Sequence, residues 1–247
     1  MALVPSICSS INLPCIPCDA VSIVTGENKV ISNHIAYSLG LNVPRELDEN
    51  NNNGIFRPIS LGNSLGVQRG IPISGKQGIY QEFIKGYEIT TPLVYNALEK
   101  KMEILPTVVF APLNNDPDWY YGENDKHNQQ GYEFKIIKLD SKIKRKYIEL
   151  VNTLSIKTFC RIDARVKCCN KKEMMSVLET GAFFDNTYFL EINVMPTIRD
   201  NNSFCYSFQS IEHSTSIGKC IQIQKDIFGT INIHSFLLAN SMISFAP

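Results

Sequence analysis

The chain has 247 residues, of which 44% are hydrophobic, and 24 lysines and arginines balance 24 aspartates and glutamates. This composition argues against a disordered chain, and the length suits one large or two small domains. The balanced charge gives no broad field for nucleic acid or a membrane surface, and no stretch of roughly 18 apolar residues occurs, so we expect a soluble, cytoplasmic protein that binds neither.

The first half of the sequence is predicted to form one helix followed by four strands. Apolar residues recur at helical spacing over 25–39, and Gly40 follows as a C-cap. Strands are expected at four apolar or alternating stretches: 54–60, 79–84, 87–94 and 106–111. The polar segment 112–132, which carries Trp119 and two tyrosines, is long for a simple turn, and this predicts a lid.

The second half is predicted to combine helices with two further strands. The apolar positions of 141–159 give the clearest amphipathic helix in the chain. Strands are expected at 160–168 and 187–194, with a short helix at 171–179 between them. From Phe204 onward helical and strand-like patterns mix, and no element is predicted there.

The eight cysteines allow a structural or a metal-binding interpretation. Cys15 and Cys18 have metal-like spacing, but no second C-x-x-C pair completes a tetrahedral zinc site. Reduced structural thiols are therefore favoured, and a zinc module around this pair is the weaker alternative.

Two apolar strands each carry a pair of polar residues. Arg161 and Asp163 share one strand face by the two-residue period, as do Glu191 and Asn193. If the two strands pair as antiparallel neighbours, all four side chains converge. Two carboxylates and an amide oxygen are hard ligands suited to Mg²⁺. The alternative is a polar network on an exposed sheet face.

The motifs around these residues carry a family resemblance. Segment 159–163, FCRID, and segment 188–196, YFLEINVMP, resemble in order and spacing the catalytic strands of the ATP-grasp family, in its D-alanine–D-alanine ligase branch. The resemblance runs from near the N-terminus to Pro196. It implies that Asp163, Glu191 and Asn193 hold Mg²⁺ or Mn²⁺.

The same resemblance implies the fold and its division. The fold is α+β, with two α+β subdomains that grip ATP between antiparallel sheets. Residues 1–20 are expected to be the remnant of an N-terminal domain, 21–85 the small subdomain and 86–247 the catalytic subdomain. Arg161 is expected to stabilise the acyl phosphate and the tetrahedral species, because phosphoryl transfer depends on charge neutralisation and positioning.

The resemblance also assigns contacts to the ATP phosphates. Lys29 matches a phosphate-binding lysine, and Arg57 stands where the family has a lysine before proline. The loop 62–66 resembles the family's phosphate loop and supplies Ser64 as a catalytic candidate. In the lid, Lys126 is expected to reach the γ-phosphate. A solvated lysine at a helix start and a plain hairpin turn are the alternatives for Lys29 and the loop.

Segment 81–88, QEFIKGYE, resembles the hinge strand that presents its backbone to adenine. Gln81, Glu82 and Ile84 are therefore the adenine candidates, and the Gln81 side-chain carbonyl can accept from the adenine amino group. Glu88 is the ribose candidate.

The function expected from this reading is an ATP-dependent carboxylate–amine ligase that forms an amide or peptide bond through an acyl phosphate. Its substrates would be small molecules, either amino acids or a small peptide. The alternative is a catalytically inactive ATP-binding remnant that regulates a partner. Most of the family's N-terminal domain is expected to be missing, so a homodimer or a partner could supply that part. Thr197 replaces a family glycine, and 202–204 only roughly matches the second-substrate motif.

Overall fold

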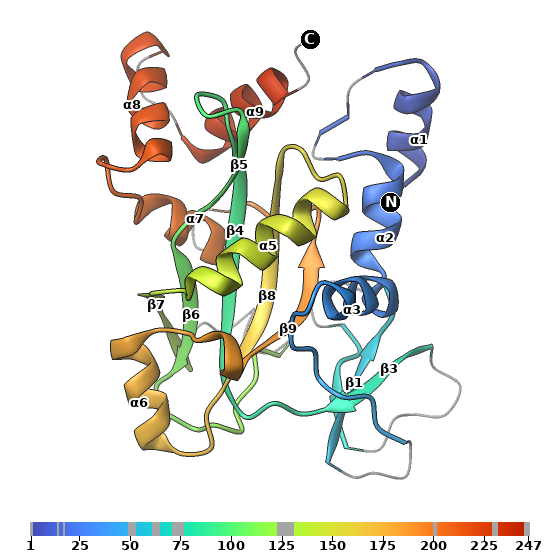
Figure 1. Ribbon diagram of the computed structural model, residues 1–247, viewed down its shortest axis with the longest axis vertical. Helices are drawn as coiled ribbons and strands as arrows, with labels where there is room; N and C mark the ends of the chain where they lie inside the picture. Colours follow the sequence, from blue (N-terminus) through green and yellow to red (C-terminus); the bar gives the residue numbers. More distant parts are fainter. Residues whose placement is uncertain are drawn as a thin grey trace.

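Two antiparallel sheets organise the computed structural model (Figure 1). The structure describes residues 2–13, 15–16, 18–48, 53–60, 65–70, 77–122, 131–199, 202–228 and 232–244. The small sheet has the order β2 (Gln68–Arg69), β1 (Gly54–Pro58), β3 (Gly78–Glu82). The large sheet has the order β7 (Tyr132–Ile137), β6 (Thr107–Pro112), β4 (Gly86–Asn96), β8 (Phe159–Lys167), β9 (Thr187–Asn193), and β5 (Lys101–Ile104) pairs with the end of β4. The result is a mixed α+β fold, as predicted.

The large sheet has one apolar face and one polar face. Ile89 on β4 and Ile162, Ala164 and Val166 on β8 are fully buried in a core shared with helix α5 (Ser141–Thr153). Because neighbouring residues of a strand point to opposite sides, the charged residues of β8 lie on the other face. Sequence alternation therefore separates the core from a polar surface that is available for chemistry.

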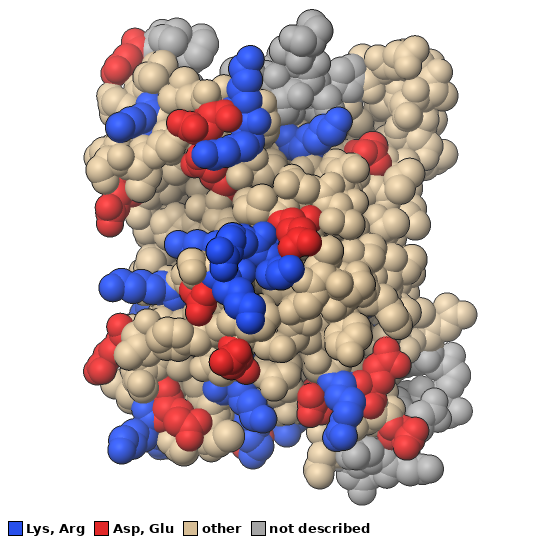
Figure 2. All heavy atoms as spheres, viewed as in Figure 1, with Lys and Arg blue, Asp and Glu red and all other residues tan. Residues whose placement is uncertain are grey.

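Helix α5 crosses the apolar face of the sheet (Figure 1). It begins after Asp140, whose side chain accepts a hydrogen bond from the Lys142 amide and caps the helix. The predicted extension to residue 159 is wrong, because the chain leaves the helix after Thr153 and turns through Ser155, where φ is 55°. The basic residues of its outer side gather in the middle of the surface in Figure 2.

The N-terminal region contains three helices, α1 (Leu3–Ser10), α2 (Ala20–Glu27) and α3 (Lys29–Ser38). The single helix predicted over 25–39 is wrong, because Asn28 separates α2 from α3. Its side chain accepts hydrogen bonds from the amides of Val30 and Ile31 and so caps α3. Gly40, with φ of 80°, follows the helix end as predicted. This break places Lys29 in the first turn of α3.

The remaining predicted strands and the helix at 171–179 are all present, with ends shifted by a few residues. Strands β2, β5 and β7 were not predicted. Between β8 and β9 lie α6 (Lys171–Thr180) and a 3₁₀ turn, Phe184–Asn186. The C-terminal region forms α7 (Ser203–Gln209), α8 (Ser216–Phe228) and α9 (Ile233–Ser244), which build a second apolar cluster against β4.

The structure also bears on disulfide bonds and on membrane-spanning helices. None of the eight cysteines is part of a disulfide. Within the described ranges, no helix combines the length and the apolar character that crossing a membrane requires.

Candidate functional site

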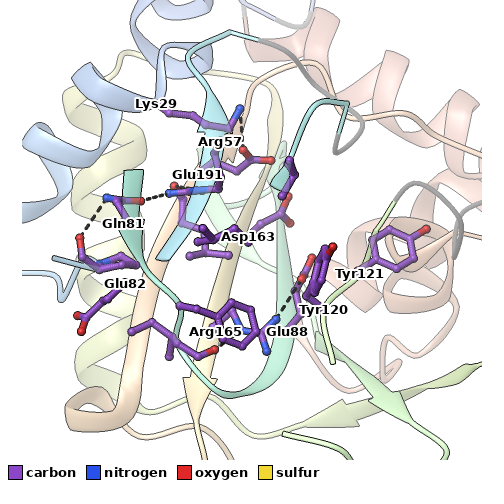
Figure 3. A pocket seen from close by; sticks show the side chains of 16 residues that line it. Lys29, Arg57, Gln81, Glu82, Glu88, Tyr120, Tyr121, Asp163, Arg165 and Glu191 are labelled. Carbon is purple, nitrogen blue, oxygen red and sulfur yellow. Dashed lines mark hydrogen bonds and ion pairs between the residues drawn. The ribbon is translucent and has the colours of Figure 1, made fainter. Parts of the chain in front are cut away.

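A cleft of about 700 Å³, including its open mouth, lies between the small sheet and the polar face of the large sheet. Its walls come from α3, from β1 and β3, from residues 83–84 of the hinge that joins β3 to β4, and from β4, β8 and β9. The described residues 113–122, here called the aromatic loop, close one side through Tyr120 and Tyr121. In Figure 3, Lys29, Arg57 and Glu191 gather at one end of the cleft, and Glu88 and Arg165 lie at the other.

The polar residues on β8 and β9 converge as the sequence predicts. The two strands are antiparallel, with Arg161 opposite Asn193 and Asp163 opposite Glu191. Arg161 donates from Nε and Nη2 to both oxygens of Asp163, at 2.8 and 2.7 Å. Thr90 on β4 donates to Asp163 Oδ1 at 2.6 Å. The Asp163 carboxylate, in a residue only 8% exposed, is therefore held in one orientation.

Asn193 completes this group. Its amide fits its surroundings when Oδ1 accepts from Arg161 Nη2 and Nδ2 donates to Met195 O, both at 3.3 Å. The oxygen thus lies on the side of Arg161, next to the two carboxylates.

Glu191 is bound from across the cleft by Lys29. The Lys29 Nζ lies 3.0 Å from Glu191 Oε2, and only 7% of the Lys29 side chain is exposed. Burial raises the pKa of Glu191, but Lys29 together with Arg57 and Arg161 outweighs burial and holds that pKa below its ordinary value. Glu191 is therefore ionised at neutral pH.

Arg57 adds a further buried cation to this end of the cleft. Its Nη1 donates to Leu190 O at 3.1 Å and its Nη2 to Gln81 Oε1 at 2.5 Å. The Nε atom is buried and has no hydrogen-bond partner in the described chain. A buried donor without a partner is costly, so an anionic ligand at this position would relieve that cost.

The Gln81 side chain is fully engaged within the protein. Besides accepting from Arg57, it donates to Pro44 O at 3.0 Å and to Asn33 Oδ1 at 3.3 Å. Its most direct task is to orient Arg57. The adenine contact expected for it remains a prediction.

The hinge between β3 and β4 presents a backbone donor. Ile84 lines the cleft and is 5% exposed, and none of the described residues provides an acceptor for its N–H. Buried backbone N–H groups are nearly always paired, so a ligand acceptor suits this position. The neighbouring Glu82 also lines the cleft, and its Oε1 accepts from the Arg45 amide at 3.1 Å.

Glu88 faces a residue that the sequence analysis missed. Arg165 Nη1 lies 3.5 Å from Glu88 Oε2, and the two residues are register partners on β4 and β8. Burial raises the pKa of Glu88 to about 7, although Arg165 opposes that shift. Arg165 follows Asp163 by two residues on the same strand face, and this period was the signal that could have identified it.

Two further predicted residues, Ser64 and Lys126, lie outside the described residues. The described part of the aromatic loop is held by contacts to both sheets. Asp118 binds Arg69 on β2, at 3.3 Å, and Lys85 in the hinge, at 2.8 Å.

The side chains of Asp163, Glu191 and Asn193 fit a hard divalent cation only in part. Among the described residues, no group of three or more His, Cys, Asp or Glu side chains could hold a metal ion, and this applies to Cys15 and Cys18 as well. Asp163, Glu191 and the Asn193 amide offer two carboxylates and one neutral oxygen. Mg²⁺ needs few protein ligands when phosphate oxygens complete its shell, so these residues fit an ion that arrives with a nucleotide.

Comparison with known proteins identifies the fold. No protein-family model matches the sequence, and no curated protein matches it by sequence. The structure resembles VanG D-Ala:D-Ser ligase from Enterococcus faecalis, with a TM-score of 0.61 and 14% identity over 90% of this chain and 68% of the ligase. It also resembles D-alanine–D-alanine ligase from Bacillus anthracis complexed with ATP, with a TM-score of 0.56 and 15% identity over 92% of this chain and 76% of that one.

A third similar structure is D-alanyl-alanine synthetase A from Vibrio cholerae, with a TM-score of 0.60 and 15% identity over 90% of this chain and 72% of the synthetase. At such identities the likeness establishes the fold, which is the α+β ATP-grasp fold of D-alanine–D-alanine ligases.

Proposed function

We propose, from the ATP-grasp fold and the chemistry of its cleft, that this chain is an ATP-dependent carboxylate–amine ligase that acts through an acyl phosphate. The observation that carries the proposal is the group Arg161, Asp163, Glu191 and Asn193 on paired strands, with Lys29 bound to it from α3. Mixed charges of this kind suit phosphoryl transfer, in which the protein neutralises and positions charge.

The cleft can accommodate a nucleotide along its length. The unpaired Ile84 N–H suits a ring nitrogen of adenine, and Glu88, close by on β4, suits the ribose hydroxyls. Lys29 and Arg57, at the opposite end, suit the phosphates. Lys29 and Arg57 both line that end of the cleft, so two cations are available there for an anionic ligand.

Asp163, Glu191 and Asn193 are the residues that would hold Mg²⁺ or Mn²⁺ with the nucleotide. Such an ion, when bound, supplies charge neutralisation for the phosphates. Arg161 fixes Asp163 through two hydrogen bonds, and its positive charge would stabilise a negative charge that develops beside Asp163.

In the proposed reaction a substrate carboxylate oxygen attacks the γ-phosphorus of ATP, and the bond to the β,γ-bridging oxygen breaks to release ADP. An amine then attacks the acyl carbon, loses a proton and expels phosphate, which leaves an amide. The similar structures are named for ligation of D-alanine with D-alanine or D-serine, so D-amino acids are the first substrates to test.

The second candidate is an ATP-binding module without turnover. It is favoured by one observation, namely that both carboxylates already have protein cations as partners, Arg161 for Asp163 and Lys29 for Glu191. In that case ATP would bind and no ADP would appear.

The test is ADP release from Mg²⁺-ATP with a panel of D- and L-amino acids as acid and amine. Asp163→Asn and Glu191→Gln keep the shape of the side chains and should abolish release. Glu149→Gln, on the exposed side of α5, is the matched control and should behave as the unaltered chain. Nucleotide binding without amine-dependent turnover for any pair would favour the second candidate.

A further inference from the structure

Arg165 is a buried cation at the end of the cleft that holds the hinge. It is 3% exposed, lies on β8 two residues beyond Asp163, and lines the cleft beside Phe83 and Glu88. Its guanidinium carbon lies 4.8 Å from the centre of the Phe83 ring. None of the roles described above uses this side chain.

The Arg165 guanidinium joins three separate parts of the chain. Its Nε donates to Ile84 O at 2.6 Å, and its Nη2 donates to Gly86 O at 2.6 Å and to Trp119 O at 2.9 Å. The Nη1 atom lies 3.5 Å from Glu88 Oε2 and makes no hydrogen bond within the described chain. One planar group therefore contacts the hinge, the aromatic loop and the ribose candidate.

Because the Arg165 guanidinium is buried, the groups around it must stabilise its charge. Burial lowers the pKa of Arg165 to about 10, against the opposing effect of Glu88, so the side chain still carries its charge at neutral pH. A buried cation depends on nearby acceptors, and the three hydrogen-bond acceptors of Arg165 are backbone carbonyls. These carbonyls must keep their positions if they are to stabilise the charge of Arg165. The position of the aromatic loop therefore depends on that of the hinge.

The aromatic loop has other polar contacts, including a hydrogen bond that the Tyr121 amide donates to Glu88. The pairs of Asp118 with Arg69 and Lys85 lie at the surface, where ion pairs contribute little. The Gly86 amide donates to Pro117 O at 2.8 Å, and the ring of Tyr120 meets that of Phe83 edge-on. Among the described cations that contact this loop, Arg165 is the buried one.

We propose that Arg165 is a positioning residue that couples nucleotide binding to the aromatic loop. This proposal rests on the proposed function, since the ligand is taken to be a nucleotide whose ribose hydrogen-bonds Glu88. A ribose hydroxyl bound to Glu88 fixes the carboxylate that faces Arg165, and Arg165 in turn holds Trp119 O. Coupling of this kind is reciprocal, so whatever secures the loop also tightens nucleotide binding by the same factor.

The chain provides its own reporter, because Trp119 is its one tryptophan. Tryptophan emission and its quenching by acrylamide are measured for the unaltered chain and for Arg165→Met, each without nucleotide and with Mg²⁺-ATP. Calorimetry measures the ATP dissociation constant for the same samples. Lys167→Met, at an exposed position further along the same strand face, is the matched control.

We expect Arg165→Met to leave Trp119 more open to quenching in the absence of ligand. It should also remove the protection that ATP gives to Trp119 in the unaltered chain. By the reciprocal coupling, it should weaken ATP binding about ten-fold or more. Arg165→Lys keeps the charge without the planar fork and should give an intermediate result. If Arg165→Met fails to fold, Arg165→Lys still tests the proposal.

Two results would overturn the coupling in distinguishable ways. If the unaltered chain binds ATP and Trp119 responds identically in it and in the Arg165 variants, Arg165 does not couple the loop to the ligand, while the proposed function stands. If calorimetry detects no ATP binding by the unaltered chain, both the proposed function and the coupling fail.

Discussion

Lys29 Nζ lies 3.0 Å from Glu191 Oε2, and this ion pair joins the first turn of α3 to β9 across the end of the cleft. Removal of the lysine leaves a partly buried carboxylate whose remaining cationic neighbours, among the described residues, are Arg57 and Arg161. We predict that Lys29→Met lowers the free energy of unfolding by about 1–3 kcal/mol, as measured by urea denaturation.

The double variant Lys29→Met with Glu191→Gln tests the cause of that loss. Because it removes both charges, it should regain part of the stability that the single variant loses. A double variant that is less stable than the single one would contradict the assigned role of the ion pair.

The buried Glu88 makes stability depend on pH. Burial raises its pKa from 4.5 to about 7, so the folded chain binds a proton that the unfolded chain has already released. The stabilising effect of this proton is complete below the unfolded pKa and is lost as pH rises towards 7. Relative to Glu88→Gln, the free energy of unfolding should therefore fall with rising pH, by at most about 1.4 kcal/mol per pH unit. Denaturation of both proteins between pH 5 and 8, about the range of the shift, measures the difference between their free energies of unfolding. A difference that does not change with pH would contradict the raised pKa of Glu88.

Thr90 is expected to matter for activity more than for folding. Its hydroxyl donates to Asp163 Oδ1 at 2.6 Å, whereas the hydroxyl of the neighbouring Thr91 bonds Thr107 on the opposite side of the strand. Thr90→Val should lower kcat/KM in the ligase assay about ten-fold, because a buried charged group loses a hydrogen bond worth about 1.5 kcal/mol. Thr91→Val is the matched control and should change stability alone. Equal effects of both variants on kcat/KM would argue against a role for Thr90.

The hinge requires glycine at position 86. Gly86 has φ of 123°, and a Cβ there would lie 2.1 Å from Val166 O. Gly40, with φ of 80°, has open space around its Cβ direction. Gly86→Ala should therefore cost about 3 kcal/mol or more in unfolding free energy, and Gly40→Ala about 1–2 kcal/mol. Thermal or urea unfolding of both variants checks the order, and similar losses would contradict the proposed crowding at the hinge.

The sequence predicts β8 and β9 well because strand geometry is simple. The two-residue period placed Arg161 and Asp163 on one face, and antiparallel pairing brought Glu191 and Asn193 to them. The same period points to Arg165, which the sequence analysis missed because the motif appeared complete at Asp163. Asn28 was similarly missed as a helix cap, although its residue type is one of the preferred caps.

Other features could not be predicted, since they depend on contacts between distant segments. Arg69 and Asp118 are far apart in the sequence and meet only in the folded chain, where β2 contacts the aromatic loop. The helices α7 to α9 are specified by their packing against β4, and their mixed local patterns gave no clear period. Gln81 turned out to be engaged with Arg57, Asn33 and Pro44, an arrangement that no local pattern encodes.

The most direct test of the proposed ligase reaction follows one oxygen atom from the substrate carboxylate into the released phosphate. A D-amino acid labelled with heavy oxygen in its carboxylate is incubated with Mg²⁺-ATP and an amine substrate, and the released phosphate is analysed by mass spectrometry. An acyl phosphate transfers one carboxylate oxygen to phosphate, so we predict labelled phosphate in step with amide formation, and none with Asp163→Asn or Glu191→Gln. Phosphate released without the label would show plain ATP hydrolysis and would contradict the ligase mechanism.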